Sequence, residues 1–393
     1  MVNPVSIPQY HPSAMTLLLH FISLLLLIPF SSASAWQHAH PESQHADQHA
    51  VAQPAVQLST DNEEREFIVT VGPVDLPSGG HHEDGAHGGV YPPIGTIRIP
   101  FDAYITSFRY EMVDGNGTAM PREALHHVNI NDPHHRELFL PISRRVLAAS
   151  HETGAQSAPG WLVGMPLMEG EELVVSAMFH NPTHDDLDGV SLRFIMGYRT
   201  EAGFGPLFRV YPFHIDVAFP AGHKAFNVPP GRNTWTWEGS PAVPGRIMGI
   251  GSHVHDYIES ITLTDVTGGK QLWEGCPIYG DAGQLTGITV GRQYRKLGTK
   301  IYPDHVYRVA VTYDNPTGDT LIDGGMGVVA GLFSPNRDVT WPRVDRDNPL
   351  YEIDRQHYMR EVEGKWQDLS DAVPGGSDMR GIRGKPAVGR SGC

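Results

Sequence analysis

The feature that most constrains the fold is a long series of short apolar segments punctuated by Gly and Pro. Segments such as GTIRIPFDAYITSFRYEMV, ELVVSAMFH and VSLRFIMGY alternate or run apolar and are rich in β-branched and aromatic residues. Short strands with turn signals between them are typical of β-sandwiches. A βαβ rhythm, which would predict a parallel sheet, does not occur. The sequence therefore predicts an all-β fold, with ISRRVLAAS as one brief helix.

The strands fall into two series. The first runs from about residue 90 to 198, and the second begins near Leu207 with FRVYPFHIDVAF and ends with MGVVAGLF. The ends of the two series resemble each other, since HNPTHDDLDGVSLRFIMGY and YDNPTGDTLIDGGMGVVAGLF share Asn-Pro-Thr, an acidic loop, a Gly and an apolar strand. We interpret this as a weak internal repeat and predict two β-sandwich domains of one ancestry, over residues 64–210 and 211–345.

The segments outside these domains are predicted to be targeting and polar sequences. Residues 1–35 are read as a signal peptide, because the run MTLLLHFISLLLLI is too short to span a bilayer comfortably and Ala33-Ser34-Ala35 fits a cleavage site. An uncleaved anchor is the alternative. Residues 36–63 are expected to be a disordered His-rich linker, and residues 346–393 a polar tail with one possible helix. The protein is thus expected to be secreted or periplasmic, without stable membrane insertion after cleavage.

The composition of the chain restricts the kinds of molecule that it could bind. The net charge of −15 argues against nucleic acid, whose phosphates need a basic surface. Only two cysteines occur among the 393 residues, so stability is expected to come from core size. A bridge between Cys276 and Cys393 is the less favoured interpretation, because Cys393 ends the chain.

The strongest local signal for chemistry is His-Val-His at residues 253–255. On a strand, residues i and i+2 face the same side, so His253 and His255 can converge on one metal while Val254 points away. The alternative is a pair of surface histidines. Met326, before a later apolar strand, could complete the site, although a lone Met there is more often part of a core.

A second set is weaker in isolation. His126 and His127 are neighbours, and neighbours on a strand point to opposite faces, so both could bind one metal only with a bulge or twist. His180 follows the strand LVVSAMF and could project from its end. Two other features compete: His184 in an Asp-rich turn, and the pair His134-His135, which we expect in a surface turn.

Together these six ligands favour copper. A thioether beside imidazoles is unusual for zinc, but soft sulfur stabilises Cu(I), which a copper redox site must hold during part of its cycle.

The order His-His, His, His-x-His, Met across two β-sandwich domains resembles the copper type II, ascorbate-dependent monooxygenases, the peptidylglycine α-hydroxylating and dopamine β-hydroxylating enzymes. The resemblance covers about residues 90–335 and implies two tandem antiparallel jelly-roll β-sandwich domains, each with one copper ion. It implies that His126, His127 and His180 hold the electron-transfer copper. His253, His255 and Met326 would be the catalytic set that holds the copper binding O₂.

The implied activity is hydroxylation of a C–H bond of a small-molecule or peptide substrate, with O₂ and ascorbate or another reductant. The chain departs from the family in two ways. It lacks the several disulfides of the animal enzymes, and Val128 stands where the family has a Met after the first His pair.

Two other functions compete with this one. The first is a non-catalytic extracytoplasmic copper-binding protein that uses the same ligands and captures metal with the His-rich segment as well. The second is a β-sandwich glycan-acting module, in which aromatic side chains stack on sugars. The candidates for stacking are Trp161, Trp235, Trp237 and Trp273.

Overall fold

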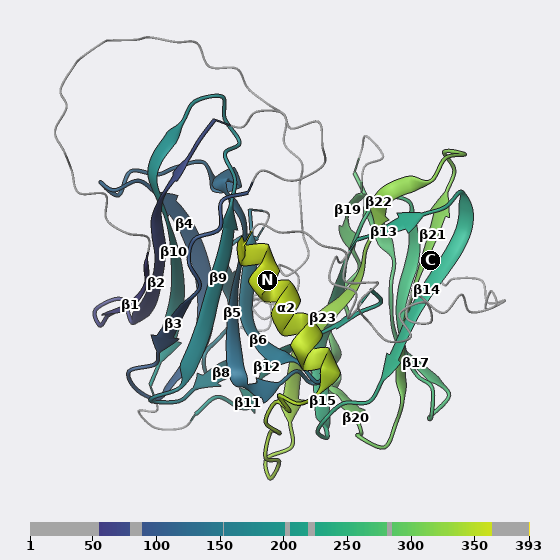
Figure 1. Cartoon of the computed structure of the whole chain (residues 1–393). Helices are drawn as coiled ribbons and strands as arrows, with labels where there is room; N and C mark the ends of the chain where they lie inside the picture. The colour runs from purple at the N-terminus through teal and green to yellow at the C-terminus, as the bar shows by residue number, and fades with distance from the viewer. Residues whose placement is uncertain are drawn as a thin grey trace, which may run out of the picture.

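The computed structural model describes residues 55–78, 89–151, 153–200, 205–218, 225–280, 285–363 and 393. The predicted signal peptide and most of the expected linker and tail lie outside these ranges. The described chain forms two tandem antiparallel jelly-roll β-sandwiches, which lie side by side in Figure 1. The predicted all-β fold is confirmed.

The first sandwich contains two sheets, ordered β1-β2-β10-β4-β8-β11, with β7 beside β4, and β3-β9-β5-β6. Its strands are β1 (Ala55–Asp61), β2 (Glu66–Leu76), β3 (Gly95–Arg98), β4 (Ala103–Val113), β5 (Leu125–Arg136), β6 (Ser143–Ser150), β7 (Gln156–Ser157), β8 (Val163–Leu167), β9 (Glu172–Phe179), β10 (Leu187–Arg199) and β11 (Phe208–Arg209).

The second sandwich has the sheets β12-β23-β15-β20 and β14-β21-β16-β17, with two small hairpins, β13-β22 and β18-β19. Its strands are β12 (Tyr211–Asp216), β13 (Phe226–Val228), β14 (Gly231–Gly239), β15 (Gly245–Val254), β16 (Ile258–Asp265), β17 (Lys270–Gly275), β18 (Pro277–Tyr279), β19 (Leu285–Ile288), β20 (Thr299–Ile301), β21 (Tyr307–Asn315), β22 (Leu321–Gly325) and β23 (Gly327–Pro335). Its main strand order copies the first: β12-β23-β15-β20 corresponds to β2-β10-β4-β8, and β14-β21-β16-β17 to β3-β9-β5-β6.

The internal repeat extends to individual hydrogen bonds in the Asn-Pro-Thr turns. In the first copy, the Asn181 side-chain amide donates to two backbone carbonyls, and its Oδ1 accepts from the amide and the hydroxyl of Thr183. In the second copy, Asn315 and Thr317 make the same four bonds. The shared Asn-Pro-Thr therefore ends β9 and β21 in the same way, because one side chain satisfies the backbone groups that the turn exposes.

Three sequence expectations are corrected. The segment ISRRVLAAS is not a helix, because Ser143–Ser150 forms the edge strand β6 and alternates between the core and the outer face. Residues 55–61 form β1 and pair with β2, so they do not belong to the linker expected over residues 36–63. Cys276 and Cys393 form a disulfide, which brings the end of the chain back to the second sandwich.

The connection between β5 and β6 belongs to the second sandwich rather than the first. Leu138, Phe139, Leu140 and Ile142 are almost completely buried, and they are part of the hydrophobic core of the second sandwich. The carbonyl of Leu138 also accepts a hydrogen bond of 2.6 Å from the amide of Ala242. One loop of the first domain thus fills the core of the second, which joins the two sandwiches firmly.

A polar clasp lies beside this loop. Asp132 is completely buried and binds both Arg144 (2.6 Å) and His135 (2.7 Å). Burial alone would raise the pKa of Asp132, but the His135 hydrogen bond and the charge of Arg144 outweigh it, and the pKa lies below its usual value. The Arg144 guanidinium in turn packs over the rings of Tyr211 and Trp341, at 4.8 and 5.2 Å. Arg144 therefore ties the first sandwich to aromatic rings on the second part of the chain.

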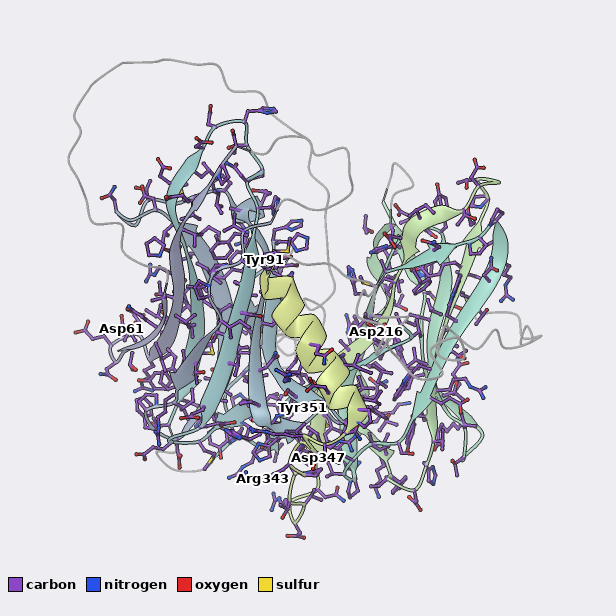
Figure 2. The ribbon with its side chains drawn as sticks, in the orientation of Figure 1. Asp61, Tyr91, Asp216, Arg343, Asp347 and Tyr351 are labelled. Atoms are coloured by element: carbon purple, nitrogen blue, oxygen red, sulfur yellow. A yellow bond between two sulfur atoms is a disulfide. The ribbon has the colours of Figure 1, made fainter. Side chains whose placement is uncertain are left out.

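The chain after β23 returns to the first sandwich. The indole of Trp341 donates to the carbonyl of Arg136, and Val344 donates to the carbonyl of His134. His134 and His135 were expected in a surface turn; they lie at the end of β5 instead, half-buried under this returning segment. Helix α2 (Pro349–Glu363) then crosses diagonally in front of the sandwiches, and Figure 2 shows Arg343 and Asp347 below its lower end. No helix in the described part of the chain is long and apolar enough to cross a membrane.

Replacing Phe139 by Ala should lower the free energy of unfolding by about 3–5 kcal/mol, because it leaves a cavity in the core of the second sandwich. Ile322→Ala, at a side chain 72% exposed, is the control and should change stability by less than about 0.5 kcal/mol. Urea unfolding measures both. A Phe139→Ala protein as stable as the control would contradict the role assigned to this loop.

Candidate metal centres

His126 and His127 project from the same face of β5 because the strand has an irregularity there. The register with β9 shifts between Leu125 and His127. Leu125 and Val128 both point into the core of the first sandwich, although a regular strand would place residues three apart on opposite faces. The extra residue leaves both histidines on the outer face. The bulge that a shared metal would require is therefore present.

The geometry of the pair suits a common ion. The two Nδ1 atoms lie 3.0 Å apart, a distance that also allows a hydrogen bond between the rings. Imidazole nitrogens bind zinc at about 2.0–2.1 Å. Two ring nitrogens 3.0 Å apart are close enough to hold one metal ion together.

His180 lies next to this pair. It directly follows β9, and its backbone amide donates to the carbonyl of Ala124, so main-chain bonds hold it beside the start of β5. Its ring centroid is 6.0 Å from that of His126. The three predicted ligands of the first set are thus neighbours, and all three are half-buried.

The second set also shares one face. Ile250 and Val254 on β15 point into the core of the second sandwich, so His253 and the following His255 lie on its outer face. Their ring centroids are 5.7 Å apart. His253 is paired with Val328 on β23, and continuing this register brings His255 opposite Met326. The three predicted ligands therefore gather where β15 ends and β23 begins.

Tyr313 fixes this junction, and sequence reasoning missed it. Its hydroxyl accepts hydrogen bonds of 3.0 Å from the amides of His255 and Met326 and donates one of 2.6 Å to the carbonyl of Met326. Burial raises the pKa of Tyr313 to about 12, so the hydroxyl keeps its proton and can donate. The residue reads as core in VYRVAVTYDN, and only its tertiary position reveals that it holds two candidate ligands.

The two sets occupy the same end of their sandwiches but different sheets. The first lies where β4 leads into β5 and β9 ends, and the second where β15 leads into β16 and β23 begins. In the repeat, β5 and β9 correspond to β16 and β21, whereas the second set uses β15 and β23.

Convergence within each set is incomplete. Among the described residues, no group of three or more His, Cys, Asp or Glu side chains meets the geometry of a metal site. His184, the competing candidate, is exposed in its turn. The second set reaches three donors only with the Met326 sulfur.

The tryptophans give little support to a sugar-stacking surface. Trp273 is buried in the core of the second sandwich. Trp235 and Trp237 pack against that core, and the ring of Trp235 lies 4.6 Å from that of Phe226. Trp161 is the one of the four that is largely exposed.

Comparison with known proteins identifies no relative by sequence. No protein-family model matches the chain, and no curated protein matches it. Solved structures that resemble it include the major capsid protein P2 from bacteriophage PM2. The match has 9% sequence identity and a TM-score of 0.34, and it covers 68% of this chain and 99% of the capsid protein. Another is the STIV MCP, with 11% sequence identity and a TM-score of 0.30; the match covers 63% of this chain and 95% of the STIV MCP. A third is PNGF-II, with 8% sequence identity and a TM-score of 0.30; the match covers 69% of this chain and 66% of PNGF-II. The likeness is loose, and we draw no function from it.

Replacing Tyr313 by Phe should destabilise the protein by at least about 2 kcal/mol, because it removes the partner of three backbone groups at the junction of β15 and β23. Tyr307→Phe is the matched control. Tyr307 is equally buried, but among the described residues its hydroxyl accepts only from the amide of Tyr302, a residue that is 41% exposed.

Hydrogen exchange at the His255 and Met326 amides should also rise in Tyr313→Phe and not in Tyr307→Phe. Equal behaviour of the two variants would show that Tyr313 is ordinary core.

Proposed function

We propose that this protein is an extracytoplasmic copper-dependent monooxygenase that hydroxylates a C–H bond with O₂ and a reductant such as ascorbate. The observation that carries the proposal is the second set: two imidazoles on one face of β15, with Met326 opposite His255 when the register with β23 is continued. Tyr313 is bonded to the backbone of His255 and Met326. A soft sulfur beside imidazoles favours copper over zinc, because it stabilises the reduced ion.

The first set supports the same proposal. The irregularity in β5 places His126 and His127 on one face with their Nδ1 atoms 3.0 Å apart, and His180 lies beside them. Three imidazoles without sulfur form a harder site than two imidazoles with a thioether. The resemblance to the copper monooxygenases would assign electron transfer to the first set and O₂ binding to the second.

The role of the chain is to hold and tune the ions. Bound copper would supply one-electron transfer at the first site and activation of O₂ at the second. His253, His255 and Met326 leave room for further ligands, because they are only three donors on an outer face. His180, whose ring centroid lies 6.0 Å from that of His126, would complete the first site. The loop that inserts Leu138, Phe139, Leu140 and Ile142 in the second core would hold the two sites at a constant separation.

The disulfide supports the location. A Cys276–Cys393 bridge is favoured in oxidising compartments and rare in the cytosol. This agrees with a secreted or periplasmic protein whose apolar segment near the N-terminus is a signal peptide.

Copper counting tests the two-site model. The purified protein should retain two copper ions after dialysis against a weak chelator, which strips loosely held metal from the His-rich segment. His253→Ala should retain one ion, and His126→Ala should retain the other, because the ligand sets lie on different sandwiches. His184→Ala, at an exposed histidine outside both sets, is the control and should retain two. Loss of both ions from either single variant, with the fold intact by circular dichroism, would refute independent sites.

Met326→Ile tests the sulfur. It exchanges one apolar side chain for another of similar volume and should cost at most about 1.5 kcal/mol of stability. Cu(I) affinity at the second site should fall because the soft donor is gone, whereas Cu(II) binding by the two imidazoles should largely survive. Competition with a Cu(I) chelator measures this. An unchanged Cu(I) affinity would remove Met326 from the site.

Oxygen uptake separates an enzyme from a copper-binding protein without turnover. The copper-loaded protein should consume O₂ when ascorbate is added, and Met326→Ile should consume far less. Two tightly bound copper ions without ascorbate-dependent uptake above that of Met326→Ile would favour the non-catalytic alternative.

A further inference from the structure

A pocket of about 200 Å³ lies between the two sandwiches. The first sandwich contributes residues of β4, β6 and β8, and the second contributes β12 and β23. The wall is mostly apolar, and includes Ile105, Phe108, Leu147, Met165, Val328 and Leu332. Binding sites for small molecules commonly lie at such domain interfaces.

The pocket exists because small residues meet there. Ala148 on β6 and Ala330 on β23 both line it, and Ala330 is paired with Gly251 on β15. An engineered apolar cavity of about 150 Å³ holds benzene. A single-ring molecule with a short substituent therefore fits this volume.

Five polar residues interrupt the apolar wall: Ser107, Glu137, Arg145, Gln156 and His214. His214 on β12 is 7% exposed and lies opposite Ala330. Its Nδ1 is 3.3 Å from Oε1 of Glu137, which is completely buried. The carboxylate is fully engaged, since it also accepts from the amides of Arg145 and Leu138. The opposite ring nitrogen, Nε2 of His214, is buried and has no hydrogen-bond partner among the described residues.

An orphaned buried nitrogen is costly unless something satisfies it. We propose that this pocket binds a compact apolar molecule with one hydroxyl group, which pairs with Nε2 of His214. A hydroxyl suits the position because it can donate to a neutral imidazole and accept from a charged one. The apolar remainder of the ligand fills the space between Phe108, Met165 and Leu332. This site needs no metal and stands whether or not the copper proposal holds.

Two probes of matched shape test the site: p-cresol, which carries the hydroxyl, and toluene, which lacks it. The full chain is titrated by isothermal calorimetry with a chelator present, so that metal plays no part. Both probes should bind with one-to-one stoichiometry. p-Cresol should bind about fivefold more tightly, as one neutral hydrogen bond would give.

Substitutions locate the binding. Ala330→Leu fills the pocket and should weaken both probes at least tenfold, whereas Ala55→Leu, on the distant edge strand β1, should leave both unchanged. His214→Asn keeps a donor near Glu137 and deletes Nε2. It should bind toluene as the wild type does and lose the preference for p-cresol. If His214→Asn does not fold, Ala148→Leu, which fills the pocket from the other sandwich, replaces it as the second variant.

Three results would overturn the proposal. The first is that the wild type binds neither probe. The second is that Ala330→Leu binds p-cresol as tightly as the wild type does. The third is that folded His214→Asn still binds p-cresol more tightly than toluene by the wild-type factor. A protein that binds the probes but no copper would keep this inference and reject the proposed function.

Discussion

The arrangement of the molecule depends on one loop that changes domains. Leu138, Phe139, Leu140 and Ile142 leave the first sandwich and are buried in the core of the second. Withdrawing these large apolar side chains from the core of the second sandwich would leave a cavity there. Separating the two sandwiches would therefore cost several kcal/mol of free energy, about 2–5 kcal/mol for each large side chain. The placement of the two sandwiches against each other, and with it the pocket between them, depends on this insertion.

Strand alternation places His253 and His255 together, and a break in that alternation places His126 and His127 together. On β15 a regular strand brings His253 and His255 to one face, and the third donor comes from β23 through the register. On β5 the alternation has to fail, and the irregularity after Leu125 puts His126 and His127 together. A regular strand can present alternate residues to a ligand, but neighbouring residues only at a bulge.

The internal repeat explains the scaffold and not the ligands. Asn181 and Asn315 make the same bonds in equivalent turns. The residue before the first is His180, whereas the residue before the second is Asp314, whose amide bonds to Tyr257. The candidate metal ligands therefore occupy positions that the repeat does not relate. The turn chemistry belongs to the shared fold, whereas the candidate ligands lie at positions that differ between the two copies.

The sequence by itself determined the fold class, the two strand series, the repeat and the shared face of His253 and His255, because these depend on local periodicity and turn residues. Sequence reasoning was wrong where contacts between residues distant in the chain determine the structure. The segment after Ile142 has helical composition, but it pairs with β5 and becomes an edge strand. Cys276 and Cys393 are 117 residues apart, and only folding brings them together. Tyr313, His214 and Glu137 read as ordinary strand or loop residues. Their roles come from neighbours distant in the chain, which a pattern of nearby residues cannot reveal.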